Sequence, residues 1–77
     1  MATFSEEIEL PENAKFLHAA YQGTELYMWF KVNPEERTIK RTFQIFGTGH
    51  ELGDYYMEYR ATVHQDIFVW HIFETFN

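Results

Sequence analysis

The sequence lacks cysteine and is poor in residues that loosen a chain, with four glycines and two prolines among 77 residues. Without cysteine, neither a disulfide nor a cysteine-based zinc site can hold the fold together. A chain this short buries only about 60% of its unfolded surface, so a core of large side chains has to stabilise it. No internal repeat, low-complexity tract or linker-like segment interrupts the sequence, which predicts a single domain over residues 1–77.

Long apolar runs and basic residues are also scarce. No stretch approaches the roughly 20 apolar residues that a membrane-spanning helix needs, and the first residues lack the basic and apolar regions of a secretory signal. We therefore expect a cytoplasmic protein without a membrane partner. Six Lys and Arg stand against twelve Asp and Glu, and this net charge of −6 argues against direct binding of nucleic acid.

Aromatic residues, by contrast, are plentiful. Phe, Tyr and Trp make up 19% of the chain, and each can bury about 150–250 Å². This content excludes intrinsic disorder and exceeds what one small core needs. The surplus that we expect outside the core comprises Tyr27, Trp29, Tyr55, Tyr56, Phe68 and Trp70. Packing on two-sided strands, a homodimer or binding to another protein would each account for it.

Apolar and polar residues alternate along most of the chain and are interrupted by turn residues, which predicts an all-β fold. We expect a small antiparallel barrel or sandwich of five to six strands. The expected strands cover residues 5–10, 14–22, 26–32, 38–46, 57–64 and 67–76. Gly23 marks a hairpin turn between the second and the third.

The alternation also predicts which face of each strand is buried. Leu26, Met28, Phe30 and Val32 share a core face, and Tyr27, Trp29 and Lys31 share the opposite one. In the second strand Phe16, His18 and Ala20 share one face, and in the fifth Tyr59 shares a face with Met57, Ala61 and Val63. Arg41 falls on the apolar face of its strand, so we expect that strand at a sheet edge. The last strand is apolar on both faces, so we expect it in the middle of a sheet or with its second face against a partner.

Two helical alternatives remain. Leu52, Tyr55, Tyr56 and Tyr59 have helical spacing, so a short helix near 51–59 competes with a loop followed by a strand. Asn33 and Pro34 are suited to start one helical turn in the connection before the fourth strand.

Two blocks, FQIFGTGH at 43–50 and VWHIFE at 69–74, resemble a family of small uncharacterised bacteriophage and prophage proteins. That family has an F-x-I-F-G-T-G-H block and a V-W-H-x-F-E ending. Segments 8–11, 14–18 and 29–34 match as well, so the resemblance covers nearly the whole chain. The sequence departs from the family at its start and at 59–63, where a glycine usually precedes the threonine. The resemblance implies an all-β accessory protein in the cytosol of a phage host and names no catalytic residues.

The loop Gly47-Thr48-Gly49-His50 is a candidate ligand site, because glycines let backbone N–H groups face an anion and a histidine can donate a proton. A small ligand or nucleotide would then lie on Gly47, Thr48, Gly49 and His50 with Trp70 and His71 as walls. The alternative is a tight turn or bulge that His50 holds by a hydrogen bond.

Metal and catalytic sites have less support. His50, His64 and His71 could converge, but no pair has the spacing of a zinc site. No serine or threonine has the surroundings of a nucleophile, and the carboxylates are typical of a solvated surface. We expect no cofactor, no metal and no enzymatic activity.

The leading functional hypothesis is a phage-derived protein that binds and inhibits a host protein, such as a CRISPR or other anti-phage defence component. An acidic surface can compete for the basic groove of a protein that binds nucleic acid. The residues expected to bind the partner are Glu6, Glu7, Glu9, Glu12, Glu35, Glu36, Tyr55 and Tyr56. A phage structural component is a further alternative.

Overall fold

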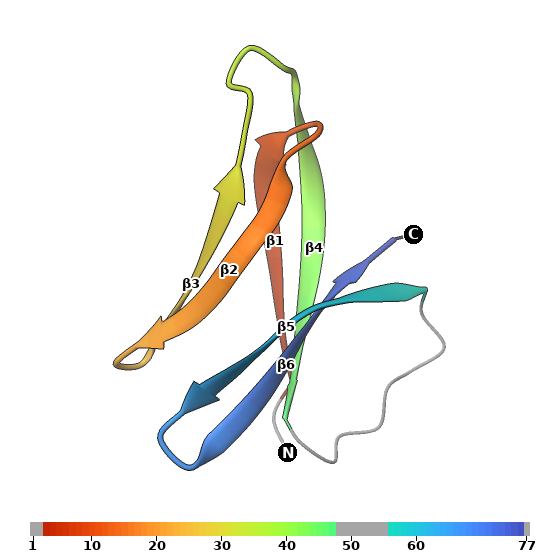
Figure 1. Ribbon diagram of the computed structural model, residues 1–77. Helices are drawn as coiled ribbons and strands as arrows, with labels where there is room; N and C mark the ends of the chain where they lie inside the picture. The colour runs from red at the N-terminus through yellow and green to blue at the C-terminus, as the bar shows by residue number, and fades with distance from the viewer. Residues whose placement is uncertain (1–2, 48–55, 77) are drawn as a thin grey trace.

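Six β-strands make up most of the part of the chain that the computed structural model describes, residues 3–47 and 56–76 (Figure 1). The strands are β1 (Thr3–Pro11), β2 (Lys15–Gln22), β3 (Glu25–Lys31), β4 (Thr38–Gly47), β5 (Met57–Gln65) and β6 (Phe68–Thr75). Four form an antiparallel sheet in the order β1-β4-β6-β5, and β2 and β3 form a separate antiparallel hairpin. The all-β prediction with six strands is confirmed.

Neither helical alternative appears within these two ranges. β5 begins at Met57, and residues 51–55 lie outside the described residues. The connection after β3 is a turn in which the Asn33 side chain accepts a hydrogen bond from the Glu35 N–H at 3.1 Å. No described helix is long and apolar enough to cross a membrane.

Two tight turns close the hairpins β2–β3 and β5–β6. Gly23, with φ of 66°, occupies the left-handed region that a glycine adopts without steric cost. Asp66 has a φ of 57° at the corresponding position of the second turn. Asp is one of the few residues with a side chain that tolerates this conformation.

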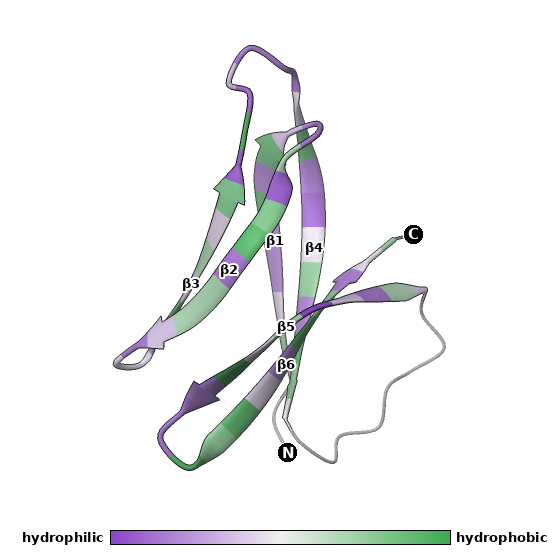
Figure 2. Ribbon diagram, viewed as in Figure 1, coloured by the Kyte–Doolittle hydropathy of each residue, from purple (hydrophilic) through white to green (hydrophobic). Residues whose placement is uncertain are grey.

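The alternation of hydropathy along the strands is visible in Figure 2 and builds a core between the hairpin and the four-stranded sheet. Phe43 and Ile72 are fully buried, and Ala19 of the hairpin packs in the same cluster. The predicted core face of β3 is confirmed for Leu26, Met28 and Phe30, which pack against this cluster. Val32 follows the end of β3 and is 44% exposed, so its predicted place in the core is wrong.

A β-bulge in β2 reverses the faces expected for part of that strand. Phe16 pairs with Phe30 and His18 pairs with Trp29, which leaves Leu17 as the extra residue. Phe16 therefore faces the core while His18 is exposed, although strict alternation predicts one face for both.

A second bulge interrupts β5 at Arg60, between Tyr59, which pairs with Phe73, and Ala61, which pairs with Ile72. Ala61 packs against the core, whereas Tyr59 is 56% exposed and its ring lies edge-on to that of Phe73 at 5.7 Å. The expectation that Tyr59 shares a face with Ala61 is wrong, because the extra residue shifts the alternation.

Arg41 does not lie at a sheet edge, since β4 is paired on both sides, with β1 and with β6. Its guanidinium forms a two-pronged ion pair with Glu74 of β6, with Nε to Oε2 at 2.6 Å and Nη2 to Oε1 at 2.7 Å. Arg60 of β5 donates to the same Oε1 from Nε at 3.1 Å and from Nη2 at 3.0 Å. The edge prediction is wrong because a carboxylate neutralises this arginine inside the fold.

This buried ion cluster, defined as Arg41, Glu74 and Arg60, also ties the hairpin to the four-stranded sheet. Arg41 donates a further hydrogen bond to the carbonyl oxygen of Ala14, next to the start of β2, and its guanidinium lies 5.8 Å from the centre of the Phe30 ring. Burial acts to raise the pKa of Glu74, but the hydrogen bonds and charges of Arg41 and Arg60 outweigh it and hold that pKa below its ordinary value. Glu74 is therefore a carboxylate at neutral pH.

Candidate binding groove

The two sheets meet on one side of the molecule and stay apart on the other. On the closed side, β2 of the hairpin comes into contact with β5. On the open side lie the edge strands of the two sheets, β1 and β3, whose backbones are not in contact with each other. A groove of about 580 Å³ remains between them.

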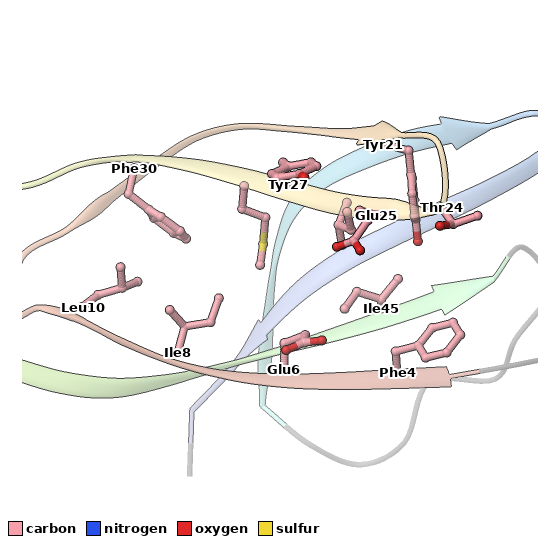
Figure 3. A pocket seen from close by; sticks show the side chains of 12 residues that line it. Phe4, Glu6, Ile8, Leu10, Tyr21, Thr24, Glu25, Tyr27, Phe30 and Ile45 are labelled. Carbon is pink, nitrogen blue, oxygen red and sulfur yellow. The ribbon is translucent and has the colours of Figure 1, made fainter.

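Side chains from both edge strands line this groove, and those of Ile8 and Leu10 on β1 point toward that of Phe30 on β3 (Figure 3). β1 contributes Phe4, Glu6, Ile8 and Leu10, because residues two apart in a strand project from the same face. The other lining residues are Tyr21, Thr24, Glu25, Leu26, Tyr27, Met28, Phe30 and Ile45. Most of these side chains are apolar, and many belong to residues that pack at the margin of the core.

The charged residues that line the groove are both glutamates. Glu6 projects from β1 and Glu25 begins β3 at the hairpin turn, and both are exposed. Within residues 3–47 and 56–76, neither forms an ion pair. Burial raises the pKa of the nearby Tyr21, so its phenol stays protonated and available as a hydrogen-bond donor. The groove thus combines apolar walls with negative charge that has no counter-ion in the described chain.

The other glutamates expected at a partner surface lie outside the groove. Glu7 and Glu9 are on the opposite face of β1 from Glu6, and Glu7 is 3.8 Å from Nζ of Lys40. Glu12 is 2.7 Å from Nη2 of Arg37 and Glu36 accepts a 2.7 Å hydrogen bond from Asn13, while Glu35 lies in the exposed turn after β3. The predicted acidic residues therefore occupy two faces and one end of the fold.

Tyr56 lies near this end of the fold. It is 65% exposed, and its ring packs at 5.8 Å against that of Phe76, which lines the same surface depression as Glu12. Tyr55 lies outside the described residues.

The predicted aromatic surplus is in part at the surface. Tyr27 and Trp29 are 44% and 42% exposed on the outer face of the hairpin, where Trp29 stacks on His18 with ring centres 5.4 Å apart. Phe68 is also exposed. Trp70 is buried instead, and its indole N–H donates to Gln65 at 3.2 Å, so it does not belong to the surplus.

Of the alternative ligand site, the structure describes Gly47 and the two predicted walls, Trp70 and His71. Trp70 packs inward against Phe4, whereas His71 lies on the other face of β6 and its Nδ1 is 3.0 Å from the hydroxyl of Thr62. Consecutive residues of a strand project to opposite faces, so these two cannot form walls of one site. Gly47 ends β4, and Thr48, Gly49 and His50 lie outside the described residues.

Two of the three histidines considered for a metal lie in the described residues. His64 and His71 lie on the paired strands β5 and β6, but His50 is outside the described ranges. Among residues 3–47 and 56–76, no group of three or more His, Asp or Glu side chains could hold a metal ion.

The sequence pattern does not predict the groove, although the residues of the first strand carry part of the information. Phe4, Ile8 and Leu10 fall on one face of the first strand because they are separated by even numbers of residues. Glu6 places a charge on this otherwise apolar face. A charge on the inner face of a strand indicates an edge or a site that is open to water. Which strand of the second sheet lies opposite depends on packing between sheets, which the sequence pattern does not specify.

The fold and the groove define a small two-sheet β-protein whose interior opens along one side. The chain belongs to the family described as "Domain of unknown function (DUF7352)", whose model matches residues 2–77. No curated protein and no solved structure was found to match the chain.

Proposed function

We propose that this protein is a phage-derived accessory protein that binds a host protein and inhibits it without catalysing a reaction. The observation that carries the proposal is the groove between β1 and β3, which is apolar, open on one side and flanked by Glu6 and Glu25. Exposed apolar clefts with a polar rim are typical sites of protein recognition. Such a groove suits an extended segment that carries both apolar and basic side chains.

The charge of the whole molecule supports the same class of partner. A net charge of −6 attracts basic proteins over a range of about 8–10 Å at physiological salt and speeds their association. Proteins that bind nucleic acid have basic surfaces, and an acidic protein can occupy them in place of phosphate. A CRISPR effector or another nucleic-acid-binding defence component is the most concrete form of the target.

A plaque assay tests the inhibitory role. The protein is expressed in a host with an active CRISPR system and in an isogenic host without it, and plaquing of a targeted phage is compared. We expect the wild type to raise plaquing only on the defended host. We expect Glu6→Lys to abolish this effect, because it places a positive charge in the groove.

Glu9→Lys is the matched control, since it makes the same charge change on the opposite, exposed face of β1. It should retain most of the effect. In pull-downs from the same host, the retained protein should bind at least about tenfold more weakly to Glu6→Lys than to Glu9→Lys. Its binding to the wild type should weaken as the salt concentration is raised. Equal retention by the two variants, or no rise in plaquing with the wild type, would contradict the proposal.

A further inference from the structure

The outer edge of β3 is free in the described structure. β3 pairs with β2 on one side, and none of the described strands pairs with its other side. An unpaired edge exposes a row of backbone donors and acceptors that another strand can use. This edge belongs to the smaller of the two sheets, and a strand added there would extend it beyond two strands.

The sequence of β3, ELYMWFK, is complementary to itself in the antiparallel direction. If two copies pair about Met28, Glu25 of each copy lies opposite Lys31 of the other. Leu26 then meets Phe30, and Tyr27 meets Trp29. The two residues of each pair also lie on the same face of β3, because the burial of β3 alternates strictly along its length.

Charges at the two ends of β3 indicate which partner suits this edge. Lys31 pairs with Lys15 of β2, so two positive charges lie side by side at one end of the hairpin. Like charges directly opposite in a sheet are unfavourable, and a carboxylate beside Lys31 would relieve them. Neither Glu25 nor Lys31 forms an ion pair within the described ranges.

The other open edge, β1, lacks this complementarity. It contains three glutamates and no basic residue, so no antiparallel register of β1 with itself pairs opposite charges. Pro11 also removes a backbone donor at its end. Of the two edges beside the groove, β3 alone is suited to a second copy.

We propose that the protein forms a symmetric dimer in which the β3 strands of two copies pair antiparallel about Met28. The two hairpins then form one four-stranded sheet in the order β2-β3-β3-β2. This is an isologous interface, in which the same surface of each copy meets itself across a two-fold axis. β3 is also one wall of the groove, so we expect a second copy and a host segment to exclude each other there.

Charge reversal tests the register directly. In Glu25→Lys or Lys31→Glu alone, both ion pairs of the dimer become like-charge pairs, and we expect association to weaken at least about tenfold. In a mixture of the two variants, one chain carries lysine at both positions and the other carries glutamate at both. Opposite charges then meet again at each end of the paired strands, so a heterodimer should form about as tightly as the wild-type dimer.

Sedimentation equilibrium over a range of concentrations measures the wild type, each variant and their mixture. Circular dichroism checks the fold of each variant, whose changed side chain is exposed.

A cysteine cross-link gives a second readout. The chain contains no cysteine, so Met28→Cys introduces a single thiol at the two-fold axis, where paired strands lie about 4.5–5.5 Å apart between Cα atoms. Oxidation should link Met28→Cys into a dimer and should leave Leu26→Cys, two residues from the axis, mostly unlinked.

A wild type that stays monomeric at millimolar concentration would overturn the proposal, as would a Glu25→Lys variant that dimerises like the wild type. A mixture in which the two variants do not associate would also contradict the register. The proposal of host binding is tested on Glu6, which these experiments leave unchanged, so either proposal can fail alone.

Discussion

Two regions of the molecule depart from the usual rule that charged side chains are exposed and large apolar side chains are buried. In the ion cluster, Glu74 is 1% exposed although it carries a charge, whereas in the groove Phe4 is 50% exposed although it is apolar. Each region has its own explanation. The cluster is sealed because two arginines supply the donors that the Glu74 carboxylate needs, and the groove is open because the hairpin has only two strands to cover a four-stranded sheet. We infer that the first region supports stability and the second supports binding.

The sharpest way to test this contrast is to remove the carboxylate of the cluster. Glu74→Ala removes the only ion-pair partner of Arg41 within the described residues and leaves Arg60 paired with Glu58 alone. Breaking a buried pair in this way costs about 3–5 kcal/mol. A domain this small has a total stability of similar size, so we expect the variant to be largely unfolded at 25 °C by circular dichroism.

Arg60→Ala is the control for the cluster, because it preserves the two-pronged pair between Arg41 and Glu74. It should cost less than Glu74→Ala in urea denaturation. A loss below about 1 kcal/mol for Glu74→Ala would contradict the structural role of the cluster.

Acid should weaken the ion cluster, because it protonates the Glu74 carboxylate. The pKa of Glu74 is lowered in the folded state, so its contribution to the free energy of unfolding is fully present above its ordinary value near 4.5. That contribution is lost as the pH falls through the lower folded-state pKa. Urea denaturation at a series of pH values should show this loss in the wild type. Glu74→Gln should lack that part of the pH dependence, and an identical profile in both proteins would contradict the assignment.

A smaller effect on stability is expected at Ile8 in the groove wall, and the smallest at the exposed Arg37. Ile8→Ala should cost about 1 kcal/mol, below the 2–5 kcal/mol of a fully buried isoleucine, because Ile8 is only half-buried. Arg37→Ala, which breaks an exposed ion pair with Glu12, should cause no measurable change in the urea midpoint. A cost of about 3 kcal/mol or more for Ile8→Ala would show that the groove wall belongs to the core.

Much of the fold follows from local patterns. The alternation of Leu26, Met28 and Phe30 defines β3 and its buried face, and Gly23 marks the turn before it. The apolar character of both faces of residues 67–76 places β6 correctly in the middle of its sheet. These features depend on residues close together in the chain, which a single sequence displays directly.

The features that local patterns miss depend on contacts far apart in the chain. The pattern places Arg41 at an edge because its counter-ion, Glu74, lies 33 residues away in a strand whose register the sequence does not reveal. The groove depends on which strand of the hairpin faces β1. Trp70 is expected at the surface from its pattern, but its indole N–H finds an acceptor in Gln65 and its ring is buried.

The two bulges bear on how the length of this chain can change. Leu17 and Arg60 are each one residue more than the opposing strand requires. Deleting either residue would restore regular pairing, and every other residue of that strand would keep its present face. A deletion elsewhere in β2 or β5 would exchange the buried and exposed faces of the residues on one side of it. Leu17 is exposed and Arg60 belongs to the ion cluster, so only the first deletion leaves the interior intact. Among relatives that differ in length by one residue, position 17 is where we expect the gap to fall.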